Sequence, residues 1–155
     1  MTLDGLKKLV QKIVQQSCQL KNTHTSEKDA PVNYAAVFTQ DQEEYESILA
    51  AAKQLGLVIE QTPTGPLFKI KPLETVAGCL QLLKIRMPDK TRPERGDADF
   101  TVTNFDAFKK KYLGQPGFRL IKREKFEMIE LMDTNFEVRS YFSNPPLDQQ
   151  FGLDK

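Results

Sequence analysis

The chain has few of the residues that most often identify an enzyme or a metalloprotein. Among its 155 residues there is one histidine, His24, and there are two cysteines, Cys18 and Cys79. Two cysteines are too few for a disulfide framework and too isolated for a zinc site, so we expect buried or half-buried thiols. The sequence also lacks a Gly-rich phosphate loop, a nucleophile elbow and a Cys/His pairing. It therefore leaves open whether the protein is an enzyme.

An excess of one charge and a long apolar run are missing as well. Twenty-two basic residues face twenty-one acidic ones, which gives a net charge of +1. Such a chain lacks the broad positive field that neutralises phosphates, so we expect no nucleic-acid partner. The N-terminus has no apolar core of a signal peptide, and no run approaches the roughly 18 apolar residues of a membrane span. We therefore expect no membrane partner and a cytoplasmic location.

Apolar residues are nevertheless abundant enough for one compact domain, because 39% of the chain is hydrophobic and ten residues are Phe. Residues 1–31 are predicted to form an amphipathic helix over residues 3–21 and a polar linker over residues 22–31. The apolar stripe of this helix consists of Leu3, Leu6, Leu9, Val10, Ile13, Val14 and Cys18. We expect the helix to be an addition to the following units that packs on them, with a homodimer contact as the alternative.

Residues 32–88 are predicted to form a β-α-β-β-β unit. A strand over residues 33–38 precedes a helix that begins at Gln40 or Asp41 and ends at Gly56, where we expect a left-handed conformation. Three strands are predicted in the sequences LVIEQ (57–61), PLFKIK (66–71) and LQLLKIRM (80–87).

Residues 89–155 repeat this order of elements. A strand over residues 98–102 precedes a helix capped by Asn104. Three further strands are predicted in the sequences FRLIKR (118–123), FEMIELM (126–132) and EVRSYF (137–142). An offset of about sixty residues between the two units indicates an internal repeat. In the tail, Leu147, Phe151 and Leu153 are expected to pack on the body or on a partner.

The tandem βαβββ units over residues 33–144 resemble the vicinal oxygen chelate superfamily, which includes glyoxalases, bleomycin-resistance proteins and extradiol dioxygenases. The resemblance is topological. It implies an α+β fold in which two modules form a curved, mainly antiparallel sheet around a cavity, here preceded by an extra N-terminal helix. The alternative is a single antiparallel sheet with ferredoxin-like helix packing and no central cup.

The resemblance also implies that a divalent metal is often bound by His, Glu or Gln on the first and last strands of each module. Here the first strands offer Asn33 and Asp99, and the last strands offer Gln81 and Glu137. Zinc, nickel and iron favour imidazole, whereas carboxylates suit magnesium, manganese or calcium. We therefore expect no metal or other cofactor; if a metal is bound, Asp99 and Glu137 are its candidate ligands.

Strand alternation predicts which side chains line the cavity, because successive residues point to opposite faces of a sheet. The apolar set faces the helices and comprises Leu83, Ile85, Met87, Ala98, Phe100, Val102, Phe136, Val138 and Phe142. The opposite set is polar and comprises Lys84, Arg86, Asp97, Asp99, Thr101, Glu137, Arg139 and Tyr141. If the sheet is flat, this second face is ordinary solvated surface.

If the sheet curls into a cup, five polar residues become candidates for ligand binding: Arg86, Asp99, Glu137, Arg139 and Tyr141. Arginine suits a carboxylate or phosphate, and Tyr141 can orient the ligand by a hydrogen bond. The alternative for Arg139 is a structural ion pair with Asp99 or Glu137. Glu127 and Glu130 lie three residues apart on a strand and point to opposite faces, so we do not expect a catalytic dyad.

Three functions remain open. The favoured one is metal-independent binding of a small anionic ligand, with Arg86 and Arg139 as charge partners. The second is a glyoxalase-like lyase, isomerase or dioxygenase that uses Asp99 and Glu137 on a hard cation. The third is a protein-interaction or self-assembly module that uses the N-terminal helix and the tail.

Overall fold

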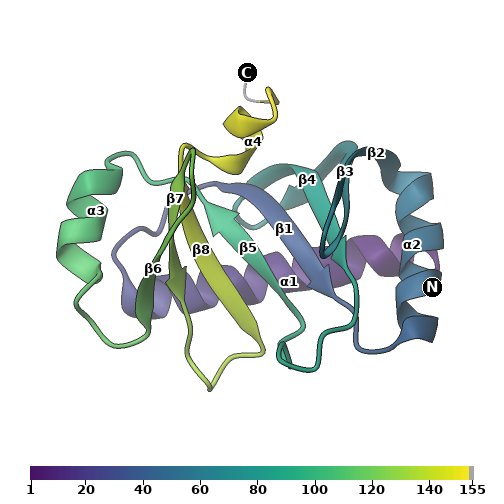
Figure 1. Ribbon diagram of the computed structural model, residues 1–155, viewed down its shortest axis with the longest axis horizontal. Coiled ribbons are helices and arrows are strands. Elements are labelled where there is room, and N and C mark those ends of the chain that lie inside the picture. Colours follow the sequence, from purple (N-terminus) through teal and green to yellow (C-terminus); the bar gives the residue numbers. More distant parts are fainter. Residues whose placement is uncertain (154–155) are drawn as a thin grey trace.

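Two βαβββ modules lie side by side in one eight-stranded mixed sheet in the computed structural model, which describes residues 1–153 (Figure 1). The first module comprises β1 (Val32–Phe38), α2 (Gln42–Leu55), β2 (Gly56–Thr62), β3 (Gly65–Thr75) and β4 (Gly78–Arg86). The second comprises β5 (Gly96–Phe100), α3 (Phe105–Tyr112), β6 (Phe118–Lys122), β7 (Glu127–Leu131) and β8 (Val138–Asn144). The predicted repeat is therefore present, with strand bounds close to those expected.

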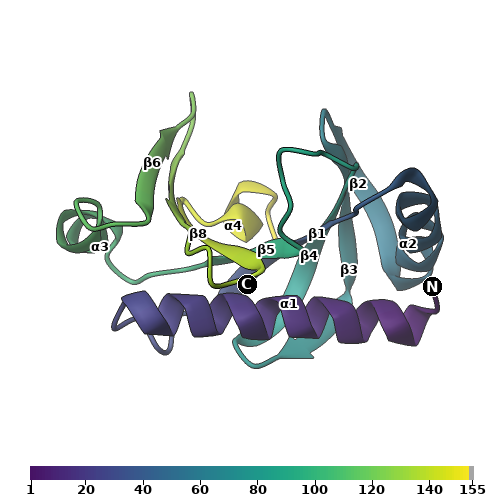
Figure 2. The same ribbon diagram turned by 90° about the horizontal axis from the view of Figure 1, so that it is seen from below.

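The two modules have the same internal strand pairing. In each, the first strand lies parallel to the last one, β1 to β4 and β5 to β8. The modules join through the antiparallel pair of β1 and β5, which gives the order β2-β3-β4-β1-β5-β8-β7-β6. Figure 2 shows that the sheet curves into a trough, with the outer strands of both modules rising on either side. The alternative without a cup is therefore wrong.

Helix α1 (Leu3–His24) runs beneath the trough on its convex side and spans both modules (Figure 2). Its apolar stripe, including Leu6, Val10 and Ile13, is part of the hydrophobic core. The Ser17 hydroxyl donates to the Arg139 carbonyl at 3.0 Å, and the Ser140 hydroxyl donates to the Ser17 carbonyl at 2.7 Å. The expected packing of the stripe on the body is confirmed, but the helix is an integral layer of the fold rather than an addition to it.

Gly56 differs from its expected conformation. It begins β2 with φ of −171°, which is extended backbone and not a left-handed helix stop. The reason for glycine is a close approach, because a Cβ at this position would clash with the Lys69 carbonyl on the paired strand. In the second module, Gly117 does adopt a positive φ, of 90°. The matching glycines of the repeat thus have different structural roles.

The strand alternation is as predicted. Ala98, Phe100, Val138 and Phe142 belong to the core on the helix side of the sheet. Asp97 and the other odd-numbered residues of β5 and β8 consequently point into the trough.

The C-terminal helix α4 (Leu147–Gln150) lies between the two arms of the trough in Figure 2 and at one end of the trough in Figure 1. A cis peptide bond between Asn144 and Pro145 redirects the chain from the end of β8 toward this helix. Within residues 1–153, no helix has the length and apolar character needed to cross a bilayer.

Candidate functional site

A cavity of about 560 Å³ lies on the concave face of the sheet. Its floor is formed by side chains of β1, β4, β5 and β8, and its sides by the outer strands of both modules. Leu147 and Phe151 of the C-terminal segment cover part of it. The curvature of the sheet therefore turns a polar sheet face into an enclosed site.

Basic side chains line one side of this cavity. Lys84 and Arg86 extend from β4, and Arg92 comes from the loop before β5. Burial lowers the pKa of Lys84, and the neighbouring Arg86 charge lowers it further. Arg86 lies over the Phe38 ring at 5.5 Å and forms a 3.5 Å ion pair with Asp89, yet its Nε is buried without a hydrogen-bond partner among residues 1–153. The Arg86 side chain thus retains an unused donor within a basic site.

Asp97 is the carboxylate closest in register to these bases. Across the sheet it pairs with Ala36 of β1, and Ala36 in turn pairs with Lys84 of β4. Asp97 is only 7% exposed, and its Oδ1 is buried without a hydrogen-bond partner in the part of the chain that the structure describes. Burial, followed by the charge of Asp99, raises the pKa of Asp97 to about 7. Its carboxyl group is therefore desolvated without compensating donors from the protein.

Asp99, two residues along the same strand, has the opposite environment. Its Oδ1 accepts hydrogen bonds from the Asn33 amide at 3.0 Å and from the Ser143 N–H at 3.1 Å. The Ser143 hydroxyl donates to its Oδ2. Burial raises the pKa of Asp99 to about 6, although these bonds act in the opposite direction. Asp99 thus connects the last strand to the first strands of both modules.

Two tyrosines also line the cavity. Burial raises the pKa of Tyr34, which therefore offers a neutral hydroxyl. Burial raises the pKa of Tyr141 as well, and its hydroxyl donates to Glu130 at 2.6 Å. Tyr141 accepts a longer contact of 3.4 Å from Arg92. Tyr34 is therefore the freer of the two hydroxyls for contact with a ligand.

Arg139 lies in an ion-pair network at the other end of the concave face, although its Nε is buried without a hydrogen-bond partner among residues 1–153. Its guanidinium donates to Glu130 at 3.1 Å and to Glu94 at 3.0 Å, and its side chain is 8% exposed. Burial acts against ionisation of Glu130, but the bond from Tyr141 and the charge of Arg119 lower its pKa. Arg139 thus forms a structural ion pair, but not with the predicted partners Asp99 or Glu137.

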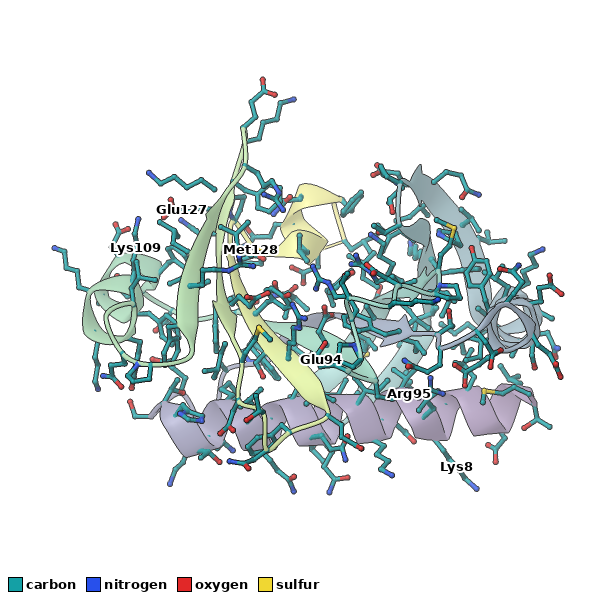
Figure 3. All side chains as sticks on the ribbon, turned by 60° about the horizontal axis from the view of Figure 1, so that its bottom comes forward. Lys8, Glu94, Arg95, Lys109, Glu127 and Met128 are labelled. Atoms are coloured by element: carbon teal, nitrogen blue, oxygen red, sulfur yellow. The ribbon has the colours of Figure 1, made fainter. Side chains whose placement is uncertain are left out.

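The β7 carboxylates occupy opposite faces, as alternation predicts. Figure 3 shows Glu127 beside Lys109 on the α3 side of β7 and Met128 on the other side, toward the trough. Glu127 accepts a hydrogen bond from Lys109 at 2.9 Å. Glu130 lies on the concave face with Arg139 and Tyr141. The two carboxylates therefore do not form a pair.

The residues present do not fit the metal site that the resemblance implies. Asp99 faces the main cavity, whereas Glu137 is exposed beside a separate hollow of about 290 Å³. Within residues 1–153, no group of three His, Cys, Asp or Glu side chains is placed to hold a metal ion. His24 bonds instead to Asp133 at 2.9 Å. The oxygens of Asp99 are already hydrogen-bonded, so we derive no chemistry through a metal here.

The two sides of the main cavity carry apolar and polar side chains. Leu67 of β3 contributes from the first module, and Phe126 and Met128 contribute from the β6–β7 hairpin of the second. Glu60 and Arg123 add charge on these sides. Leu147 and Phe151, which the sequence left between packing on the body and contacting a partner, line this site. A ligand of this cavity therefore meets charge on the floor and mixed surface with apolar patches at the sides.

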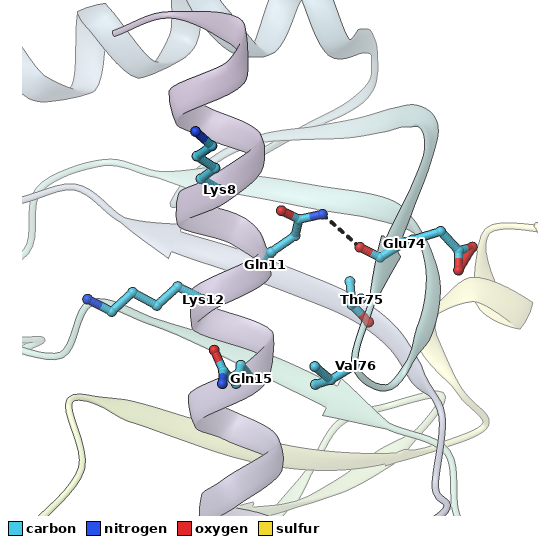
Figure 4. A pocket seen from close by; sticks show the side chains of 7 residues that line it. All are labelled: Lys8, Gln11, Lys12, Gln15, Glu74, Thr75 and Val76. Carbon is cyan, nitrogen blue, oxygen red and sulfur yellow. Dashed lines mark hydrogen bonds between the residues drawn. The ribbon is translucent and has the colours of Figure 1, made fainter.

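A second groove, of about 580 Å³, lies on the convex side between α1 and the β3–β4 turn (Figure 4). Lys8 and Lys12 border it, and the Gln11 amide donates to the Glu74 carbonyl across it at 2.9 Å. Its Lys8 and Val76 side chains are largely exposed. The described residues of this groove include no buried polar atom without a partner. We therefore take the concave cavity as the candidate site.

The structure brings together three of the five predicted ligand-binding residues. Arg86, Asp99 and Tyr141 line the main cavity, whereas Arg139 and Glu137 line the separate hollow. The prediction omitted further polar residues of the main cavity, among them Tyr34, Glu60, Lys84, Arg92, Asp97 and Arg123. Alternation had already placed Lys84 and Asp97 on the correct face. Arg92 lies in the charged loop before β5, to which strand alternation does not apply.

Cysteine exposure differs partly from expectation. Both cysteines are free, but Cys79 is exposed and only Cys18 is half-buried. Cys79 lies at the start of β4, next to the β3–β4 turn.

No protein-family model and no curated protein matches the chain. Among solved structures, a structural-genomics protein termed EC4020 is similar with a TM-score of 0.69 at 11% identity, over 90% of this chain and 86% of that one. A glyoxalase/bleomycin resistance protein/dioxygenase superfamily member from Vibrio splendidus 12B01 has a TM-score of 0.45 at 8% identity, over 74% of this chain and 97% of that one. Methylmalonyl-CoA epimerase from Mycobacterium tuberculosis has a TM-score of 0.44 at 11% identity, over 77% of this chain and 91% of that one.

At such identities, the likeness to EC4020 is one of fold alone. The architecture that the sequence resemblance implied is confirmed, because the structure has the tandem βαβββ modules and the curved sheet. The chemistry of the site has to be argued from the residues of this chain.

Proposed function

We propose that the protein binds a small organic anion in the concave cavity and that its own basic side chains neutralise that anion. The observation that carries the proposal is the basic side of the cavity, where Arg86 retains a buried Nε without a partner among residues 1–153. A buried donor without an acceptor is unfavourable, and an anionic ligand supplies the acceptor. Lys84 and Arg92 add charge beside it.

Arg139, first expected as the second charge partner, is replaced in this proposal by Lys84 and Arg92. Its guanidinium is already bonded to Glu94 and Glu130. Breaking those bonds to bind a ligand would leave two largely buried carboxylates without their partner, which is costly. Lys84 and Arg92, on the first-module side of the cavity, can contact an anion without giving up such bonds.

The proposal is tested by thermal unfolding with small carboxylates and phosphates, because a ligand that binds only the native state raises the midpoint. We expect at least one anion to raise the midpoint of the wild type. Lys84→Met and Arg86→Met should lose most of that rise. The matched control is Lys53→Met, which removes an exposed lysine on α2 and should retain it.

Two results would contradict anion binding at this site. One is an equal midpoint rise in the wild type and in both cavity variants, which would place the anion elsewhere on the protein. The other is a rise for none of the anions, even at concentrations near the solubility limit.

A further inference from the structure

The cavity holds one unused donor and one unused acceptor. The donor is Nε of Arg86 and the acceptor is Oδ1 of Asp97; neither has a hydrogen-bond partner in residues 1–153. Asp97 is only 7% exposed, and it lines the cavity. Buried polar atoms in native proteins are nearly always paired. A single ligand that satisfies both atoms must present an acceptor and a donor at once.

Residues 1–153 supply no hydrogen-bond donor to Oδ1 of Asp97. Lys84, Arg86 and Arg92 are near enough to affect its charge, yet none of them donates a hydrogen bond to it. Ala36 of β1 lies between Lys84 and Asp97 in register, and its side chain is only a methyl group. Two strand spacings of about 4.8 Å separate their backbones, which leaves room for part of a ligand.

Asp99 provides an internal comparison for this acceptor. On the same face of the same strand, it accepts hydrogen bonds from Asn33 and from both donors of Ser143. Residues 1–153 therefore donate hydrogen bonds to Asp99 but none to Oδ1 of Asp97. This difference indicates that the partner of Asp97 comes from outside the chain.

We propose that the ligand is a small organic anion that also carries a hydroxyl or amino group, whose hydrogen is donated to Oδ1 of Asp97. Its anionic group lies against Arg86 and Lys84, so this inference rests on the proposed function. Its remaining carbon atoms lie against Leu67 and Met128, two of the apolar residues at the sides of the cavity. The site therefore selects hydroxy or amino acids with an apolar substituent over simple carboxylates.

The test compares hexanoate with hydroxyhexanoates that carry the hydroxyl beside the carboxylate, one carbon further along, or at the far end. Their dissociation constants are measured by two-dimensional NMR titration, which detects weak binding. We expect one hydroxy acid to bind the wild type at least about tenfold more tightly than hexanoate, because a charged acceptor strengthens a hydrogen bond. In Asp97→Ala, the preference should fall to about one while hexanoate still binds.

Asp106→Ala, which removes an exposed carboxylate on α3, is the matched control and should keep the preference. If Asp97→Ala fails to fold, Asp97→Asn replaces it, and the preference should then decrease. The inference is overturned if no hydroxy acid exceeds hexanoate in the wild type, or if the preference survives in Asp97→Ala. In either case hexanoate binding that is lost in Arg86→Met would leave the proposed function standing. Absence of binding by every acid would instead overturn both.

Discussion

The two ends of the concave face use the same kinds of residues in different ways. At the β7–β8 end, the closed end below, Arg139 bonds to Glu94 and Glu130, and Tyr141 bonds to Glu130; the Arg139 Nε is buried without a partner within residues 1–153. At the β4–β5 end, the open end below, Lys84, Arg86 and Asp97 lie together, and polar atoms of Arg86 and Asp97 remain unpaired within residues 1–153. The carboxylates of the first end have their partners within the fold. The second end is arranged to receive them from a ligand.

This comparison shows why a polar sheet face alone does not identify a site. Both ends have charges of both signs on strands of the same curvature. What separates them is the pairing of the carboxylates. Glu130 and Glu94 accept hydrogen bonds from the protein, whereas Oδ1 of Asp97 accepts none within residues 1–153. A buried acceptor without a donor costs free energy until a ligand binds. The following predictions test this difference, beginning with the largest effect.

Breaking the closed end should cost the most stability. Glu130→Ala leaves the buried Arg139 guanidinium and the Tyr141 hydroxyl without their shared acceptor. We expect a loss of about 3–5 kcal/mol in the free energy of unfolding, measured by urea denaturation. Glu127→Ala on the same strand breaks the partly exposed pair with Lys109 and should cost at most about 1 kcal/mol. Equal losses in the two variants would argue against a structural network.

Removing the charge of Asp97 at the open end should increase the free energy of unfolding. The folded-state pKa of Asp97 is raised to about 7 from its ordinary 3.8, so the folded protein binds a proton more tightly than the unfolded chain. Stability is therefore lost as pH rises through this interval and stays lower above pH 7. Asp97→Asn removes this loss and should be more stable than the wild type by about 2–4 kcal/mol at pH 8, with little difference at pH 4.

The measurement is urea unfolding of both proteins across that pH range. The groups facing Asp97 are Lys84, Arg86, Arg92 and Asp99, and all of them remain in the variant. A difference between the two proteins that does not change with pH would show that Asp97 does not titrate in this interval.

Asp99 should behave as a structural carboxylate, unlike its neighbour on β5. Asp99→Ala leaves both Ser143 donors without an acceptor and removes one of the two bonds that the Asn33 amide donates, so we expect a loss of about 1–3 kcal/mol in unfolding free energy. The comparison is made at pH 4. At this pH the Asp99 carboxyl is already protonated in the folded protein, so removing its charge contributes little to the difference in stability. If the variant is as stable as the wild type, Asp99 has no structural role and would be grouped with Asp97 as a ligand-binding carboxylate.

The smallest effect on stability is expected from filling the floor of the open end. Ala36→Val adds methyl groups between Lys84 and Asp97 at a residue that is only 2% exposed, so anion binding should weaken by about tenfold and the free energy of unfolding should fall by about 1 kcal/mol. Ala50→Val on the exposed side of α2 is the control and should bind anions like the wild type. Unchanged binding in Ala36→Val would mean that the ligand does not reach the floor.

Much of the fold could be predicted from local pattern. Alternation placed Ala98 and Phe100 in the core and Asp97 on the opposite face, because a strand has a period of two whatever it pairs with. The repeated order of strands and helices indicated the two modules. The same patterns also separated Glu127 from Glu130, which point to opposite sides of β7.

The site itself was only partly predictable, because its members meet through long-range pairing. The partners of Arg139 come from a loop, Glu94, and from a neighbouring strand, Glu130, and no local spacing connects them. Arg92 reaches the cavity from an irregular segment in the same way. Sequence pattern gave the face of each strand, whereas the partner on that face depends on register and loop path.

The position of α1 also constrains the order in which the protein can fold during synthesis. This helix leaves the ribosome before the strands on which it packs, but Ser17 bonds to Ser140, 123 residues later in the chain. Its apolar stripe therefore lacks its final covering until β8 has been made, and contacts so distant in sequence slow folding. A nascent chain halted before β8 would expose this stripe, so chaperones that recognise amphipathic helices should retain it until the second module is complete.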